Sequence, residues 1–138
     1  MNGTDLMCGD WVLSKENDKP CKIVSINKQT DESVLLATKN GLHFDYMYKP
    51  VPIQRIHLTK NGFKAKYADD CVFVYSDGYV ITVHFDEESI DKGNNIQIPA
   101  TVFLRIDFAE KDMCMEIKYL HELQHAMKLF GIDKEIEL

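Results

Sequence analysis

The sequence predicts an α+β protein with an N-terminal SH3-like small β-barrel lobe, a second antiparallel β-sheet and a C-terminal amphipathic helix packed on that sheet. Short β-branched and aromatic runs separated by turn residues fill the chain as far as Ile117. A strong hairpin pattern surrounds Asp77-Gly78. A helical apolar period appears near the C-terminus, ahead of Gly131. Two groups of strands and one long terminal helix therefore indicate the α+β fold class.

The first group of strands predicts the β lobe. Pro50 and Pro52 close it, because proline lacks an N–H and forces the preceding residue out of helical geometry. We therefore place the lobe at residues 1–52 and the second sheet with the helix at residues 53–138, with one continuous domain as the alternative. The strands expected in the lobe are 11–13, 21–26, 34–37 and 42–46.

The second group begins at 56–63 with one helical turn or a tight loop that ends on Gly62. Two hairpins follow, separated by an acidic loop at 86–95 that leads into a short strand at 96–98. A helix over 118–130 closes the chain. The hairpin strands are expected at 72–75 with 79–85, and at 102–108 with 113–117.

The terminal helix has one apolar side, which is expected to pack on the second sheet. At 100° per residue, His121 and His125 lie on nearly the opposite side, so we expect both imidazoles to face water. The apolar side is made by Tyr119, Leu120, Leu123, Met127 and Phe130.

The same helix carries His121-Glu122-Leu123-Gln124-His125, a literal H-E-x-x-H match. In that zinc signature the two histidines hold the metal and Glu122 acts as general base. A catalytic zinc needs a third ligand in a sheltered cavity, and none is obvious after His125, although His84 and His43 stay open as upstream ligands. We favour a coincidental match with no catalytic residue, metal or cofactor, and keep a zinc-dependent hydrolase as the alternative.

A binding surface is the other candidate site. Phe44, Tyr46 and Tyr48 alternate, so on one strand they would share a face. With Trp11 nearby in a small barrel, this face is either the core or a ligand-binding surface.

Charge argues against nucleic acid as the partner. The net charge is −6, and residues 65–138 carry most of the acidic excess, about −8 against +2 for residues 1–64. An acidic protein lacks the basic footprint that gives most nucleic-acid affinity. Weak nucleic-acid binding by the N-terminal lobe through Lys22, Lys28 and Lys39 is kept as a second alternative.

The chain is expected to be cytoplasmic and not bound to a membrane. No apolar run approaches the roughly 20 residues that span a bilayer. The N-terminus has neither the basic nor the apolar region of a secretory signal. The four cysteines are scattered without a C-x-x-C pair, which favours thiols in a reducing compartment.

Several short motifs together resemble an uncharacterised family of small cytoplasmic proteins found largely in gut bacteria and their prophages or other mobile elements. The resemblance implies no activity and no catalytic residues. Relatives often carry a hydrophobic residue followed by His-Gln-Leu-Gln-Asn at the positions of Leu120 to His125, which implies that Glu122 and His125 are peculiar to this chain. The motifs are Gly9–Val12, Pro52-Ile53, His57–Phe63, Tyr119–Gln124 and Gly131–Ile136.

The function expected from these features is that of a non-catalytic binding or accessory protein of the cytoplasm, of phage or mobile-element origin. A protein partner is expected in preference to nucleic acid. The oligomeric state is left open.

Overall fold

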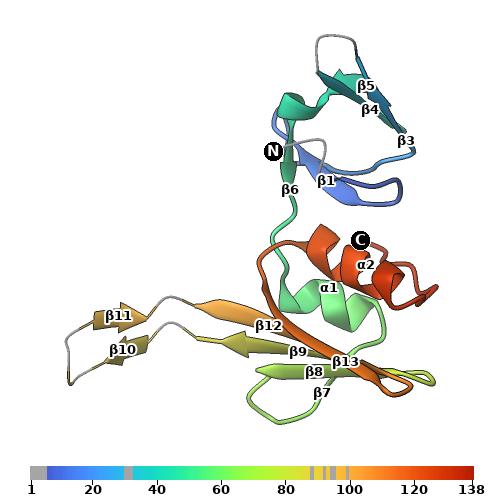
Figure 1. Cartoon of the computed structure of the whole chain (residues 1–138). Coiled ribbons are helices and arrows are strands. Elements are labelled where there is room, and N and C mark those ends of the chain that lie inside the picture. Colours follow the sequence, from blue (N-terminus) through green and yellow to red (C-terminus); the bar gives the residue numbers. More distant parts are fainter. Residues whose placement is uncertain (1–5, 30–32, 88, 92, 94–95, 99) are drawn as a thin grey trace. The chain divides into compact units, whose positions relative to one another are not determined.

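The computed structural model describes residues 6–29, 33–87, 89–91, 93, 96–98 and 100–138 (Figure 1). The chain forms two units. The first unit is Met1–Ile53 with Tyr119–Ala126, and the second is Gln54–Lys118 with Met127–Leu138.

Two three-stranded antiparallel sheets build the first unit, in the orders β2-β1-β6 and β3-β4-β5. The pairings among its described strands keep these sheets separate, and no closed barrel is found in them. The elements are β1 (Trp11–Ser14), β2 (Pro20–Lys22), β3 (Ser25–Lys28), β4 (Val34–Thr38), β5 (Gly41–Phe44), the 3-10 helix η2 (Asp45–Met47) and β6 (Tyr48–Pro50).

Strand alternation places the core of this unit. In β4, Val34, Leu36 and Thr38 are buried while the residues between them are half-buried. Burial of such β-branched and aliphatic side chains is the main stabilising contribution to a small sheet domain. The core cluster is Leu6, Val12, Cys21, Ile23, Val34, Leu36 and Tyr48.

The strand expected at 21–26 is two strands. β2 ends at Lys22 in the first sheet and β3 begins at Ser25 in the second. Between them Ile23 donates its N–H to the Asp10 carbonyl at 2.9 Å, and Val24 donates to the Ala37 carbonyl at 2.8 Å. The chain therefore passes from one sheet to the other here, which a continuous apolar run does not reveal.

The second unit is built on one antiparallel sheet in the order β13-β12-β9-β8-β7. Both predicted hairpins are confirmed, as β8 with β9 and β12 with β13. The acidic loop is shorter than expected, because part of it forms β10, which pairs with β11, the short strand predicted at 96–98. Residues 88, 92 and 94–95 of the expected loop lie outside the described residues. The strands are β7 (Lys64–Ala65), β8 (Val72–Ser76), β9 (Val80–Asp86), β10 (Ser89–Asp91), β11 (Ile96–Ile98), β12 (Thr101–Phe108) and β13 (Lys111–Ile117).

One face of this sheet is the core of the second unit. Alternate residues of β9 are buried, and they face the same side as Leu104 and Ile106 of β12. The helix α1 (Arg55–Lys60) lies over the sheet (Figure 1). As predicted, the chain ends this helix at Gly62, whose φ is +85°. The buried set includes Leu58, Phe63, Phe73, Ile81, Val83, Phe85, Leu104, Ile106, Ile117, Ile132 and Ile136.

The predicted C-terminal helix is α2 (Leu120–Leu129), and Gly131 stops it with φ at +72°. Its residues are divided between the units: Tyr119–Ala126 group with the first and Met127–Leu138 with the second. The first two turns make their side-chain hydrogen bonds within the first unit, which the expectation of packing on the second sheet did not include. Within the described part of the chain, no helix has both the length and the apolar character needed to cross a membrane.

Candidate functional site

The zinc-like motif lies on the first two turns of α2, and each of its polar residues has a specific neighbour within the first unit. His125 Nε2 lies 2.6 Å from Oδ2 of Asp10, a carboxylate that is 0% exposed. A carboxylate only accepts, so Nε2 carries the proton of this hydrogen bond. A protonated nitrogen has no lone pair for a metal, so this ring could bind zinc through Nε2 only by giving up Asp10.

The carboxylate of Asp10 is held in a tight turn ahead of β1. The Met7 N–H donates to Oδ2 at 2.7 Å, and the Asp10 N–H donates back to the Met7 carbonyl at 3.1 Å. Gly9, with φ at +93°, allows the turn and donates to the Ile23 carbonyl at 2.7 Å. Oδ1 of Asp10 receives no hydrogen bond from the residues that the structure describes. A fully buried carboxylate of this kind depends on its few donors.

Gln124, also buried, bonds to the backbone on both sides of Asp10. Its Nε2 donates to the Gly9 carbonyl at 2.9 Å, and its Oε1 accepts from the Trp11 N–H at 3.4 Å. The amide therefore satisfies two main-chain groups that the turn leaves without sheet partners. Gln124 and His125 together fasten this turn of the helix to the segment before β1.

Glu122 has a structural role at the start of the helix. Its Oε1 accepts from the Tyr119 N–H at 2.9 Å, and Tyr119 directly precedes the first helical residue. A glutamate at the third helical position that bonds back to the residue before the helix is half of a capping box. The carboxylate that the zinc motif assigns to proton transfer is therefore used to cap the helix.

The two histidines are less exposed than predicted. Both are half-buried, and the His125 side chain is only 24% exposed. The rings of His121 and His125 are 5.4 Å apart in an edge contact, while His121 stacks on Tyr119 at 5.8 Å. The expectation of a solvated face is wrong because helical periodicity shows where apolar groups pack, whereas a polar face is also buried when its groups find hydrogen bonds.

No group of three or more His, Cys, Asp or Glu side chains among the described residues is arranged to hold a metal ion. The two histidines proposed as upstream ligands belong to no such group. His84 is on β9 in the second unit and forms a 3.7 Å contact with Asp86, and His43 is on β5. The hydrogen bonds of His125 to Asp10 and of Gln124 to Gly9 link this turn of the helix to the segment before β1.

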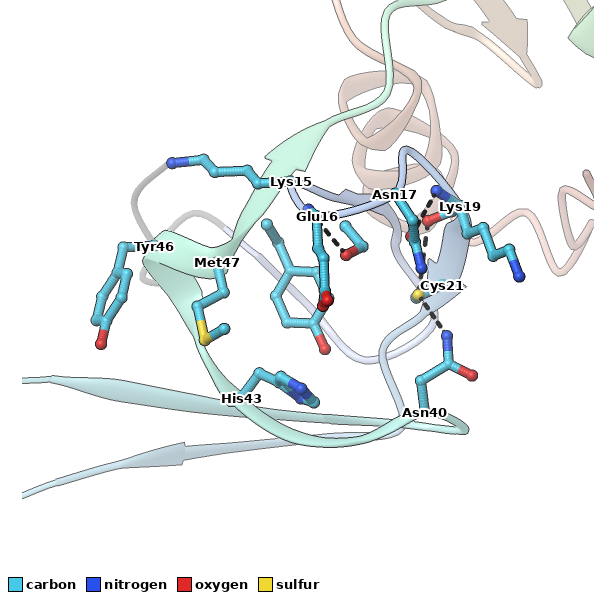
Figure 2. Close-up of a pocket in the computed structure, with 11 residues that line it drawn as sticks. Lys15, Glu16, Asn17, Lys19, Cys21, Asn40, His43, Tyr46 and Met47 are labelled. Atoms are coloured by element: carbon cyan, nitrogen blue, oxygen red, sulfur yellow. Dashed lines mark hydrogen bonds between the residues drawn. The ribbon is translucent and has the colours of Figure 1, made fainter.

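A pocket of about 430 Å³ in the first unit is the better candidate for binding (Figure 2). It lies between the segment that joins β1 to β2 and the segment from Asn40 through η2 to β6. Figure 2 shows Glu16, Met47 and His43 directed into the same space, while Lys15 and Tyr46 extend outward. The lining residues are Ser14, Lys15, Glu16, Asn17, Lys19, Cys21, Asn40, His43, Tyr46, Met47 and Tyr48.

Two of the four aromatic residues expected on a binding surface, Tyr46 and Tyr48, line this pocket. The prediction that Phe44, Tyr46 and Tyr48 share one face of a single strand is wrong. β5 ends at Phe44, and the 3-10 helix that follows turns Tyr46 and Tyr48 to different environments. Tyr46 is 61% exposed and Tyr48 is buried. Phe44 stacks on Tyr46 with ring centres 5.5 Å apart, and Trp11 is half-buried on β1 beneath the Lys22 ammonium.

The polar lining of the pocket is partly organised. The Asn40 amide contacts Cys21 Sγ at 3.1 Å, and the thiol points to the Lys19 carbonyl at 3.6 Å. His43 packs edge-on to Tyr48 at 6.0 Å, and its Nδ1 is buried without a hydrogen bond from any residue that the structure describes. The His43 ring therefore lines the pocket with its Nδ1 turned into the protein, away from any bound group. The sequence did not mark Asn40 or His43 as part of a binding pocket, because each is a lone polar residue near a turn, and His43 was considered only as an upstream zinc ligand.

The three lysines considered for nucleic acid do not form one patch. Lys28 pairs with Val34 at the start of β4, and Lys39 follows the last residue of that strand. The length of the strand, on the order of 15 Å, therefore separates them. Lys22 lies on β2 in the other sheet, with its ammonium 5.8 Å from the Trp11 ring centre.

Comparison of the chain with protein-family models, with curated proteins and with solved structures finds no match.

Proposed function

We propose that this protein is a non-catalytic binding module that holds a segment of a protein partner in the pocket of its first unit. One observation carries the proposal. A pocket of about 430 Å³ has an exposed tyrosine and an exposed methionine, Tyr46 and Met47, among its lining residues. Exposed aromatic and methionine side chains are enriched in protein interfaces, because aromatic rings bury large areas and methionine adapts to varied apolar partners.

The chemistry of the lining suits a peptide segment. Tyr46 and Met47 offer apolar contact, while the Asn17 and Asn40 amides and the His43 ring offer hydrogen bonds. The lining carries both signs of charge, so no strong field selects a polyanion such as nucleic acid. A mixed, partly apolar surface is typical of transient protein recognition.

The proposal includes an SH3-like architecture for this lobe. Its support is the arrangement of two three-stranded sheets, the passage of the chain from β2 into β3 between them, and the 3-10 helix before β6. SH3 domains dock extended protein segments on aromatic-lined grooves. This is an analogy of fold, and the lining residues carry the functional argument.

The non-catalytic part of the proposal is supported by the uses of the motif residues. His125 binds Asp10, Gln124 binds the backbone around it, and Glu122 caps the helix. We place the protein in the cytoplasm and propose a phage or mobile-element origin on the sequence resemblance alone.

A peptide-display selection on the full chain tests the proposal. Selected peptides should bind with affinities that fall at least tenfold in a Tyr46→Ser, Met47→Ser variant, because the apolar contacts of both side chains are removed. The control is Tyr67→Ser, a tyrosine of similar exposure (56%) in the second unit. Fluorescence anisotropy measures the affinities. If the selected peptides bind the Tyr46→Ser, Met47→Ser variant as tightly as the Tyr67→Ser control, the pocket is not the binding site.

A further inference from the structure

The strand β13 is an edge of the sheet in the second unit, and we propose that it is a second docking site, which pairs with an extended partner segment carrying basic residues four positions apart. In the described part of the chain β13 pairs only with β12. Its other side therefore presents unpaired main-chain N–H and C=O groups over seven residues, Lys111–Ile117. Addition of a strand to such an edge is an established mode of peptide recognition.

The burial of β13 is that of an open edge. Met113 is half-buried and Ile117 is buried, while every other residue of the strand is exposed. By contrast, the neighbouring strand has Leu104 and Ile106 at 0% exposure. An added strand would cover this edge and complete the ladder.

One face of the edge is acidic. The register pairs Asp112 with Asp107 and Glu116 with Phe103, so both acids of β13 lie on the sheet face that carries Arg105. Arg105 is the one cation of this face on β12, and it contacts Asp107 at 3.1 Å and Asp112 at 3.6 Å. Glu116 forms no ion pair with a described residue. Three carboxylates against one guanidinium leave a negative face that would attract a basic segment.

The opposite face of the edge is apolar. Met113 and Met115 pair with Ile106 and Leu104, so they continue the core face of the sheet outward. Met115 is 36% exposed, and no described strand covers it on the outer side. Methionine adapts to varied apolar partners, which suits a docking surface. Lys111 also lies on this face, because it pairs with Phe108, and so does not neutralise the acidic one.

The register specifies the partner. In an antiparallel strand, residues i and i+4 would stand opposite Glu116 and Asp112, and residues i+1 and i+3 opposite Met115 and Met113. The matching pattern is therefore a basic residue, an apolar residue, any residue, an apolar residue and a basic residue. Lys-Val-Thr-Val-Lys is an example with high strand propensity.

A second copy of this chain does not fit the edge. Antiparallel self-pairing centred on Cys114 would place Asp112 opposite Glu116 twice, and like charges directly opposite are destabilising. Charge complementarity therefore favours a basic segment of another protein.

The probes are fluorescein-labelled nonapeptides with Lys-Val-Thr-Val-Lys, Glu-Val-Thr-Val-Glu or the out-of-phase Val-Lys-Thr-Lys-Val at the centre. We expect the full chain to bind the first most tightly in anisotropy titrations at low salt. Glu116→Lys should lower the affinity for that basic peptide by roughly threefold to tenfold, because an attraction between opposite charges becomes a repulsion between like charges. The same variant should raise the affinity for the acidic peptide. Lys111→Glu, on the other face, is the matched control and should leave the ratio of the two affinities nearly unchanged.

Main-chain pairing is tested on the peptide, so the fold is not disturbed. Only alternate residues of an added strand bond to the edge. N-methylation of the amides that face the sheet should abolish binding, and N-methylation of the alternate set should not. The proposal would be overturned by any of three results. N-methylation of the two alternate sets of amides could have equal effects, the in-phase basic peptide could show no preference, or the protein could self-associate in a way that Glu116→Lys alters. The Tyr46→Ser, Met47→Ser variant should bind these peptides normally, which separates this site from the pocket.

Discussion

At the scale of single residues, the fold of the first unit includes a fully buried carboxylate, Asp10. It is one of four polar or charged residues that are buried in the described part of the chain, and it receives donors from Met7 and His125. Burying a charge is costly unless a partner compensates it, so the loss of a partner costs more than the pair contributes. Asp10 and His125 are 115 positions apart, so this pair is also a long-range restraint on the start of β1.

We predict that His125→Ala lowers the free energy of unfolding by about 3–5 kcal/mol, because it leaves the Asp10 carboxylate buried without its side-chain partner. Urea denaturation followed by circular dichroism measures the change. His84→Ala is the control, since that side chain is 46% exposed and its contact with Asp86 is weak at 3.7 Å, so the loss should stay within about 0.5 kcal/mol. Equal stabilities of the two variants would contradict the role assigned to the pair.

At the scale of elements, α1 depends on a histidine in its neutral form. Nδ1 of His57 accepts from the Gln54 N–H at 3.1 Å, which satisfies a donor at the helix start. Burial, and then the charge of Lys60, lower the pKa of His57 below its ordinary value of 6.5. Between that folded pKa and 6.5 the unfolded chain binds the proton and the folded chain does not, so stability falls as the pH drops through this window.

We therefore predict that the free energy of unfolding of the wild type decreases below pH 6.5 more steeply than that of His57→Gln, which has a side-chain acceptor but does not titrate. Chemical denaturation at a series of pH values from 5 to 8 provides the comparison. Parallel pH profiles for the two proteins would show that His57 does not contribute.

The elements themselves were largely predictable, because their signals are local. Alternating residues around Asp77-Gly78 predicted the β8–β9 hairpin, and the apolar period with Gly131 predicted α2. The 3-10 helix at Asp45–Met47 was missed, since its residues alternate like a strand. The hydrogen bonds of Gln124 and His125 were also missed, because their partners near Asp10 lie more than a hundred positions away and helical periodicity carries no information about them.

At the scale of the whole molecule, the two binding proposals divide between the two units. The pocket residues belong to the first unit, and β13 belongs to the second. The chain that follows β13 enters α2, whose motif residues are bonded within the first unit. The helix that carries the zinc-like motif thus uses His125, Gln124 and Glu122 for hydrogen bonds within the first unit.

The last prediction concerns metal. Because His125 Nε2 and Glu122 Oε1 are engaged in the fold, we predict that dialysis against EDTA leaves the melting temperature unchanged and that equimolar zinc does not raise it. A site loaded at a hundred times its dissociation constant would add about 2.7 kcal/mol, on the order of 10 °C for a chain of this size. Differential scanning calorimetry and elemental analysis of the dialysed protein provide the measurements. One equivalent of zinc retained by the wild type and lost in His121→Ala would instead establish the motif as a metal site.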